Sequence, residues 1–379
     1  MDPQTALERA FALHQKGRLA EAEPLYRQAL DGVSGTAQLL LGILLSEQGR
    51  PEEALPLLAA ALVLDPDSDL ALLNHGNALA AMGRPGEAMV HYDHGLAVHP
   101  GHADLLNARG LLWLSLRRFE EALSDLDMAA AIRPDFGEAW NNRGNVLQGL
   151  KRFADAVTSF DRALTLRPDY AQGYNNRANA LRRLGRLEDA LADTDRALAL
   201  DGANAQALND RGNVLQDMNR GEEAIASYDR ALQLRPDYVE ALNNRGTAKR
   251  DLMRFDAALA DFESAIRHAP EAAQGHWSKA IVRMLQGDLG EGLRLYEWRK
   301  RLPVPIETRD YRQPLWTGAE GLRGRTLFLY IEQGLGDTIQ FYRYALMAQA
   351  RGARVILSVQ DSILRLIQDA GADIEILGS

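Results

Sequence analysis

Small and apolar residues recur along this chain with a helical spacing, and the pattern is interrupted at regular intervals by turn signals. In the stretch 140–170, one apolar stripe ends at Leu150 and is followed by the turn 151–153. A second stripe passes through Phe160, and Pro168 stops it. This stretch therefore predicts a helix, a turn, a second helix and a second turn.

Nearly the same unit recurs up and down the chain with a period of 34 residues. Prolines mark the period, with Gly202 filling one gap, at Pro66, Pro100, Pro134, Pro168, Pro236 and Pro270. The unit resembles the tetratricopeptide repeat. The resemblance implies a mainly α fold, a right-handed superhelix of helical hairpins. We expect an atypical first hairpin at Thr5–Leu30, regular hairpins starting near Gly35, Asp69, Ala103, Gly137, Ala171, Ala205 and Val239, and a degenerate one near Ala273.

Residues at equivalent positions of successive repeats form what we call a column, and three such columns predict how the helices pack. One column holds a small residue in the first helix, as at Gly144, and another holds an alanine in the second helix, as at Ala156. A third column holds large side chains such as Phe160. The small positions let two helices approach closely, so a larger residue at Gly144 is expected to overpack the interface.

Carboxamide side chains form a polar column on the first helices. Asparagine is a mediocre helix former, so its repetition within helices suggests a role beyond folding. In the resembling family the first helices line a concave surface, which implies a groove that binds an extended peptide through its backbone. The alternative is that these side chains only brace neighbouring repeats, and both roles stay open. The candidate groove residues are Asn74, Asn77, Asn142, Asn145, Asn176, Asn179, Asp210, Asn213 and Asn244.

A second polar column pairs arginines of the first helices with aspartates of the second helices. The arginines are Arg109, Arg143, Arg177, Arg211 and Arg245, and the acids are Asp127, Asp161, Asp195 and Asp229, extended by Asp93 and Glu263. A match at fixed separation predicts an ion pair within each hairpin, rather than a site for anions.

The pattern changes after the degenerate hairpin, whose aromatic residues Trp277, Tyr296 and Trp298 predict packing against the C-terminal segment. Apolar runs at 326–331, 354–359 and 373–377 alternate with helical segments at 338–351 and 361–370. This order predicts a partial α/β segment with a parallel sheet. The string EQGLGD ends the first strand, and its Gly334, Leu335, Gly336 and Asp337 are a candidate ligand-binding loop. Asp337 itself is expected to be either a helix N-cap or a general base.

The segment from Gly287 to Ser379 resembles the start of a heptosyltransferase-like glycosyltransferase domain of the two-lobed GT-B fold, and EQGLGD is the most specific part of the likeness. The resemblance implies that Asp337 is the catalytic base, and that a nucleotide-sugar would bind a second lobe. That lobe would come after residue 379, so we expect this chain to be part of a longer protein or a natural truncation. Glycosyl transfer is not expected from these residues alone.

The remaining composition narrows the classes of function. The absence of cysteine excludes disulfides and thiolate chemistry, and the eight histidines show no metal-ligand spacing, so no metal or cofactor is expected. Interspersed charges with a net charge of −9 argue against nucleic acid as a partner. No stretch is apolar enough to span a bilayer, and a cytoplasmic location is expected. The expected domains are the array at 1–302, a proline-containing linker at 303–324 and the incomplete lobe at 325–379.

These patterns support two functions. The first is a protein-interaction scaffold that binds an extended peptide or a partner protein in the groove of the array. The alternative is a nucleotide-sugar-dependent glycosyltransferase whose repeats select protein acceptors and of which this chain holds only a part.

Overall fold

The computed structural model describes residues 1–32, 34–302, 313, 316, 320–330, 334–370 and 374–378. The chain divides into two compact units, Met1–Pro236 and Asp237–Ser379. Each unit is described by itself. The expected linker at 303–324 lies for the most part outside the described residues, and the proposed domain boundary at 302 stays a prediction.

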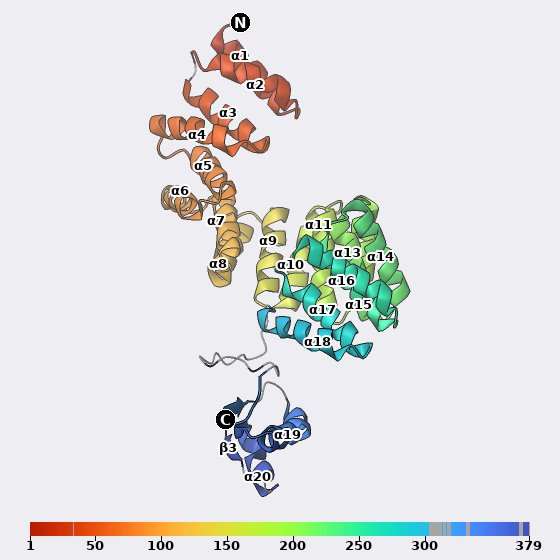
Figure 1. Ribbon diagram of the computed structural model, residues 1–379. Helices are drawn as coiled ribbons and strands as arrows, with labels where there is room; N and C mark the ends of the chain where they lie inside the picture. The colour runs from red at the N-terminus through yellow and green to blue at the C-terminus, as the bar shows by residue number, and fades with distance from the viewer. Residues whose placement is uncertain are drawn as a thin grey trace. The chain divides into compact units, whose positions relative to one another are not determined.

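The first unit is a succession of antiparallel helical hairpins (Figure 1). Each hairpin pairs an odd-numbered first helix with the even-numbered second helix that comes after it. The hairpins are α1 (Pro3–His14) with α2 (Leu19–Ala29), α3 (Ser34–Glu47) with α4 (Pro51–Leu64), α5 (Asp69–Ala81) with α6 (Pro85–Val98), α7 (Ala103–Ser115) with α8 (Phe119–Ile132), α9 (Gly137–Gly149) with α10 (Phe153–Leu166), α11 (Ala171–Arg183) with α12 (Leu187–Leu200), and α13 (Ala205–Asp217) with α14 (Gly221–Leu234). The helix starts confirm the hairpins expected from the 34-residue period to within one residue.

The turn inside each hairpin passes through a residue with positive φ. Glycine takes this position in several hairpins, whereas Lys151 adopts φ 60° in the hairpin of α9 and α10. A left-handed residue ends the first helix and reverses the chain within a few residues. Short turns of this kind keep the two helices of a hairpin antiparallel and in contact.

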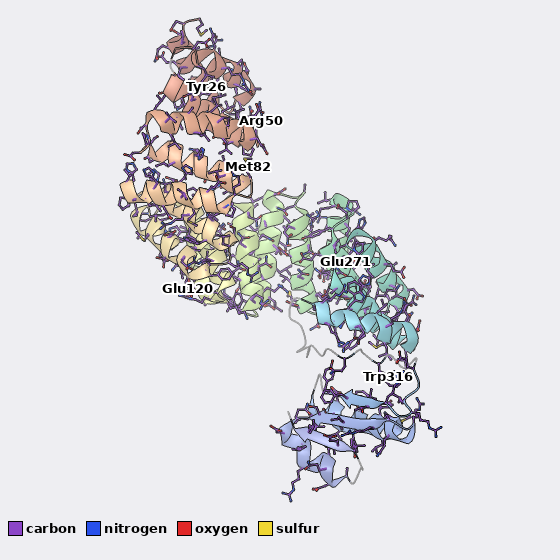
Figure 2. All side chains as sticks on the ribbon, turned by 60° about the vertical axis from the view of Figure 1, so that its left-hand side comes forward. Tyr26, Arg50, Met82, Glu120, Glu271 and Trp316 are labelled. Carbon is purple, nitrogen blue, oxygen red and sulfur yellow. The ribbon has the colours of Figure 1, made fainter. Side chains whose placement is uncertain are left out.

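The small and large columns meet across each hairpin, as predicted. A Cβ added to Gly42 would lie 2.7 Å from Leu58 Cγ, and one added to Gly246 would lie 2.6 Å from Phe262 Cε1. In the one regular hairpin of the first unit with alanine at the small position, Ala178, the facing large position holds Thr194 instead of a bulkier side chain. Both are buried. Side chains fill the spaces between successive helices, and Tyr26, labelled in Figure 2, is fully buried in the first hairpin.

The hairpins stack more closely on the side of their first helices. Successive first helices contact one another along the first unit, from α1 and α3 to α11 and α13. Successive second helices of the described hairpins approach each other less. Within the first unit, the first helices therefore line the concave side of the stack, as the repeat resemblance implies.

The second unit begins with two further hairpins and ends with a small parallel sheet. Its described elements are α15 (Val239–Asp251), α16 (Phe255–His268), α17 (Ala273–Leu285), α18 (Leu289–Tyr296), the short 3-10 helix η1 (Glu297–Arg301), β1 (Thr326–Leu329), α19 (Leu335–Ala350), β2 (Arg354–Val359), α20 (Asp361–Asp369) and β3 (Glu375–Gly378). The strand order is β1-β2-β3 with every pair parallel, and Phe328 pairs with Ile356. The predicted α/β segment is thus confirmed.

Trp298 stacks on His276 of α17, with ring centroids 3.9 Å apart. Tyr296 lines a cavity together with Tyr330 and Phe341 of the C-terminal segment, which agrees with the predicted packing of this hairpin.

Two predictions at the start of α19 need correction. The helix expected to start at Thr338 starts at Leu335, because its N-cap is Gly334. Asp337 is therefore in the first turn of α19 and is not the N-cap. Residues 331–333 and 371–373, which include parts of the expected loop and third strand, lie outside the described residues.

Candidate functional site

The candidate groove residues are joined by hydrogen bonds between the first helices of successive hairpins. Asn142 Nδ2 on α9 donates to Asn107 Oδ1 on α7 at 2.9 Å. Asn176 Nδ2 on α11 donates to Asn141 Oδ1 on α9 at 3.0 Å. Each bond links residues 35 positions apart, which is one repeat plus one residue. The bracing role left open by the sequence is therefore present in the structure for Asn142 and Asn176.

The partners in these links are residues that the sequence reasoning missed. Asn107 and Asn141 are buried, at 6% and 3% exposure, and each supplies an acceptor to the next hairpin. Asn175 holds the equivalent position on α11. The signal available in the sequence was the doubled asparagine at 141–142 and 175–176, which recurs with the repeat period and places one amide toward each neighbour.

Other predicted groove residues lie one turn further along the same helices and are bonded differently. Asn77 is exposed and accepts a hydrogen bond from the Tyr92 hydroxyl at 2.7 Å, and Asn213 accepts one from Tyr228 at 2.8 Å. These bonds fall within a hairpin. Asn145 is half-buried and forms no hydrogen bond within the described residues.

The remaining predicted members complete the column. Asn74 donates to its own helix at the Leu70 carbonyl, 2.8 Å away, and is half-buried. Asn179 donates to Asp210 Oδ2 at 3.1 Å. Asn244, on α15 of the second unit, is half-buried. The structure thus brings Asn142, Asn176 and their neighbours into one network along the first helices of the first unit.

The arginine–aspartate column differs from the predicted arrangement. Asp127, Asp161 and Asp195 do not pair within their own hairpins but with the arginine of the next hairpin. The pairs are Arg143 with Asp127 at 2.5 Å, Arg177 with Asp161 at 2.5 Å, and Arg211 with Asp195 at 2.6 Å, and Arg109 with Asp93 at 2.7 Å obeys the same rule. The prediction of pairing within hairpins is wrong for these acids, because the second helix of one hairpin packs against the first helix of the next.

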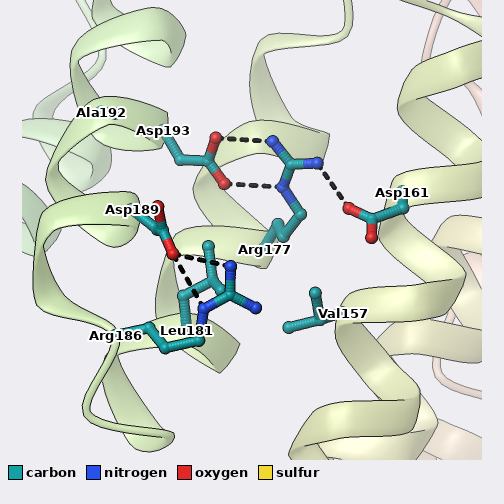
Figure 3. Close-up of a pocket in the computed structure, with 8 residues that line it drawn as sticks. All are labelled: Val157, Asp161, Arg177, Leu181, Arg186, Asp189, Ala192 and Asp193. Atoms are coloured by element: carbon teal, nitrogen blue, oxygen red, sulfur yellow. Dashed lines mark hydrogen bonds and ion pairs between the residues drawn. The ribbon is translucent and has the colours of Figure 1, made fainter.

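The partner inside each hairpin lies 16 residues after the arginine. Arg177 donates two hydrogen bonds to Asp193, both at 2.7 Å, while its third nitrogen reaches Asp161 (Figure 3). Asp193 is buried, and its hydrogen bonds raise the pKa of Arg177 above its ordinary value. In alternate hairpins a serine replaces this acid, as at Ser159 beside Arg143. The sequence held the signal, since the large packing column also lies 16 residues after the small one.

A cavity of about 210 Å³ lies beside this ion network in the hairpins of α10 to α12 (Figure 3). Its charged lining is paired internally, with Arg177 bound by two aspartates and Arg186 by Asp189 at 2.6 Å. A cavity whose charged groups already neutralise one another offers little to a charged ligand.

A larger cavity of about 340 Å³ lies in the second unit, where β1 ends and α19 begins. Its lining is mainly aromatic and aliphatic and includes Tyr330 and Phe341, with Arg299, Asp337 and Thr338 as polar or charged members. The Thr338 hydroxyl donates to Gln360 Oε1 at 3.0 Å. Gly334, Leu335 and Gly336 are exposed, and Asp337 is half-buried. Of the four predicted loop residues, only Asp337 lines this cavity.

Five models of the tetratricopeptide repeat match the chain, at residues 3–28, 45–112, 135–201, 205–238 and 244–297. The chain is therefore built on tetratricopeptide repeats, with matches in both units. None of the five models extends past residue 297, and the resemblance of the C-terminal segment to a glycosyltransferase stays a prediction.

Solved structures show the same fold. A tetratricopeptide repeat protein from Parabacteroides merdae is 20% identical with a TM-score of 0.51, over 65% of this chain and 98% of that chain. The Cut9–Hcn1 hetero-tetramer of the APC/C gives 21% identity and a TM-score of 0.57, over 76% of this chain and 57% of that chain. Pseudomonas aeruginosa PilF gives 24% identity and a TM-score of 0.50, over 55% and 95%. No curated protein matches the chain.

Metal-ligand clusters and membrane-spanning helices are both absent from the described residues. No group of three or more histidine, aspartate or glutamate side chains in the described part of the chain is arranged to hold a metal ion. Among the helices described here, none combines the length and the apolar character needed to cross a membrane.

Proposed function

We propose that the chain is a protein-interaction scaffold that binds an extended peptide segment along the first helices α5, α7, α9, α11 and α13. The observation that carries the proposal is that the carboxamides of these helices are only partly used in bracing the stack. Asn145 forms no hydrogen bond within the described residues, and Asn77 uses only its carbonyl in the bonds that the structure gives it.

An unused carboxamide suits the backbone of a peptide. It offers two N–H donors and one carbonyl acceptor, which match the C=O and N–H groups that an extended chain presents whatever its sequence. Repetition at each hairpin provides these groups at regular intervals along the concave side. A structural neighbour of this fold, Cut9, occurs in a hetero-tetramer with Hcn1, which supports a protein as the kind of partner.

The proposal is tested with a phage-displayed library of short unstructured peptides, selected on the purified full chain. We expect enriched peptides to bind in fluorescence-polarisation titrations and to share few fixed side chains, because backbone contacts tolerate sequence. Failure to enrich any peptide over a chain-free surface would contradict the proposal.

Two neighbouring asparagines separate binding from bracing. Asn145→Ala removes a side chain without a partner in the described residues, so it should weaken peptide binding about five- to tenfold and leave the unfolding midpoint nearly unchanged. Asn142→Ala removes the inter-hairpin bond to Asn107 and should lower stability by about 1–2 kcal/mol. Equal effects of both changes on stability, with none on binding, would show that the column only braces the array.

A second candidate function rests on the cavity beside β1. We propose that Asp337 acts as a general base there if the chain is part of a glycosyltransferase, because it lies at the carboxyl end of a parallel strand, where α/β sheets bind ligands. Calorimetry with a panel of UDP-, GDP- and ADP-linked sugars tests this proposal. Binding that is abolished by Phe341→Asp, a change in the cavity lining, and retained by Asp337→Asn would support a ligand site with a separate catalytic base. No binding to any of these sugars would count against the proposal.

A further inference from the structure

Asp210 interrupts the bonding pattern of the first helices. At the two preceding links, the side chain nearer the C-terminus donates: Asn142 donates to Asn107, and Asn176 donates to Asn141. At the next link the direction is reversed, and Asn175 Nδ2 donates to Asp210 Oδ2 at 2.7 Å. The reversal has a chemical cause, because an ionised carboxylate only accepts hydrogen bonds.

The reversal leaves an acceptor without a donor. Asn107 and Asn141 each use their Oδ1 in the links they form. Asn175 Oδ1 has no hydrogen-bond partner, although the residue is 3% exposed. Rotating the amide of Asn175 would only place this oxygen against the carboxylate of Asp210. A buried acceptor without a donor is rare in native proteins and costs stability.

Asp210 also lacks a counter-charge. It is 4% exposed, and its donors are neutral amides, those of Asn175, of Asn179 at 3.1 Å, of Gln206 at 3.1 Å and 3.2 Å, and of Asn209 at 3.5 Å. The two other buried carboxylates described in the first unit, Asp125 and Asp193, each form an ion pair with an arginine. No cation pairs with Asp210 in the part of the chain that the structure describes.

Charge at this position is not needed for the fold. The same column holds asparagine at 142, 176 and 244. Asn142 and Asn176 form the inter-hairpin links as donors, so the Oδ1 atoms of Asn107 and Asn141 that receive these bonds each have a partner. A residue that leaves a buried acceptor unpaired, at a position where asparagine also fits, is the kind expected at a functional position.

We propose that Asp210 and Asn175 Oδ1 together receive the ammonium or guanidinium group of a lysine or arginine side chain in the bound peptide. The inference rests on the proposed peptide-binding function and adds to it the chemistry of one ligand side chain. Two acceptors and one negative charge match a cation with several N–H donors, and such charge-assisted bonds are the strong ones.

Gln206 is the exposed residue among the donors to Asp210. It lies on α13 one turn before Asp210, is exposed, and donates to both carboxylate oxygens. Movement of this exposed side chain toward solvent would uncover Asp210. The incoming cation then replaces a neutral donor by a charged one, which compensates for the displaced hydrogen bonds.

The test compares peptide selection on the wild-type chain and on the Asp210→Asn variant, from the same library. Peptides selected by the wild type should share a lysine or arginine at one position, and those selected by the variant should not. Replacing that basic residue by glutamine in a selected peptide should weaken binding to the wild type about tenfold or more, and should not affect binding to the variant.

Stability provides an independent readout. Asp210→Asn restores a donor that can reach Asn175 Oδ1, so the variant should unfold at a higher temperature than the wild type. The matched control is Asp193→Asn, which removes a buried carboxylate already paired with Arg177. The control should lower stability and keep the preference for a basic residue.

The outcomes separate this inference from the proposed function. Peptides enriched equally by both chains, without a basic position, would overturn the cation site and leave the scaffold function in place. No enrichment by either chain would overturn both. A lower unfolding temperature for Asp210→Asn would assign Asp210 a structural role and contradict the inference.

Discussion

Two polar networks connect the hairpins of the first unit, and they differ in completeness. In the arginine–aspartate network, each buried acid has a cation, as Asp193 has Arg177. In the carboxamide network on the first helices, Asn145 has no partner in the described residues and Asn175 Oδ1 is buried without a donor. The difference agrees with the proposal that the first network serves the stack and that the second also binds a ligand.

The largest expected effect comes from breaking the complete network. Arg177→Met keeps most of the side-chain volume but leaves the buried Asp193 without its cation. We expect a loss of about 3 kcal/mol or more, since an unpaired buried charge is costly. Because repeat arrays need not unfold in one step, urea midpoints monitored by circular dichroism are the measurement to compare.

The matched control is Arg186→Met, whose partner Asp189 lies in the same cavity but on its exposed side. An exposed pair contributes at most about 1 kcal/mol, so this variant should unfold close to the wild type. Similar losses of stability in the two arginine variants would show that the buried pair of Arg177 and Asp193 contributes no more than the exposed pair.

The second prediction concerns the glycine that separates the networks. Gly144 lies between Arg143 of one network and Asn145 of the other, and a Cβ there would lie 2.6 Å from Phe160 Cζ. Gly144→Ala should therefore lower stability by about 1–3 kcal/mol through overpacking. Gly86→Ala, where a Cβ meets nothing within 4 Å, should be neutral or stabilise the helix by up to about 1 kcal/mol. Thermal unfolding of both variants would decide, and the same sign of change would refute the packing argument.

The smallest expected effect is a pH dependence of stability, and it comes from a histidine outside both networks. His75 on α5 packs against His91 on α6 with ring centroids 4.2 Å apart. Burial, with smaller contributions from His91 and Arg84, lowers the pKa of His75 from 6.5 to about 4, while Glu87 opposes the shift. The unfolded chain binds the proton more readily, so stability is present above about pH 6.5 and is lost as the pH falls toward 4.

The variant His75→Gln removes this titration. Its unfolding midpoint should fall less than that of the wild type between pH 6.5 and 4, although the carboxylates contribute to both. Parallel pH profiles would show that His75 does not titrate in this window.

Much of the fold could be predicted from the sequence, because its causes are local. The start of α9 at Gly137 and the turn at Lys151 are explained by proline positions and periodic apolar residues. The contact of Gly144 with Phe160 is explained by matched columns at a constant spacing. Prediction was poorer at the start of α19, where Gly334 caps a helix that already includes Leu335 and Gly336. The glycines of this stretch predicted a loop, but the structure places Leu335 and Gly336 in the first turn of the helix.

For the candidate site, the sequence predicted which repeat positions carry polar side chains but not which of these side chains pair with one another. The sequence alone determined that carboxamides and arginines recur on the first helices, because composition and period are properties of the chain. Only the tertiary structure decided that Asn142 bonds Asn107 and that Asp127 pairs with Arg143 of the next hairpin. The physical reason is that these partners lie on different hairpins, so their pairing depends on how one hairpin is rotated and stacked on the next, and that arrangement is set by packing across the whole interface.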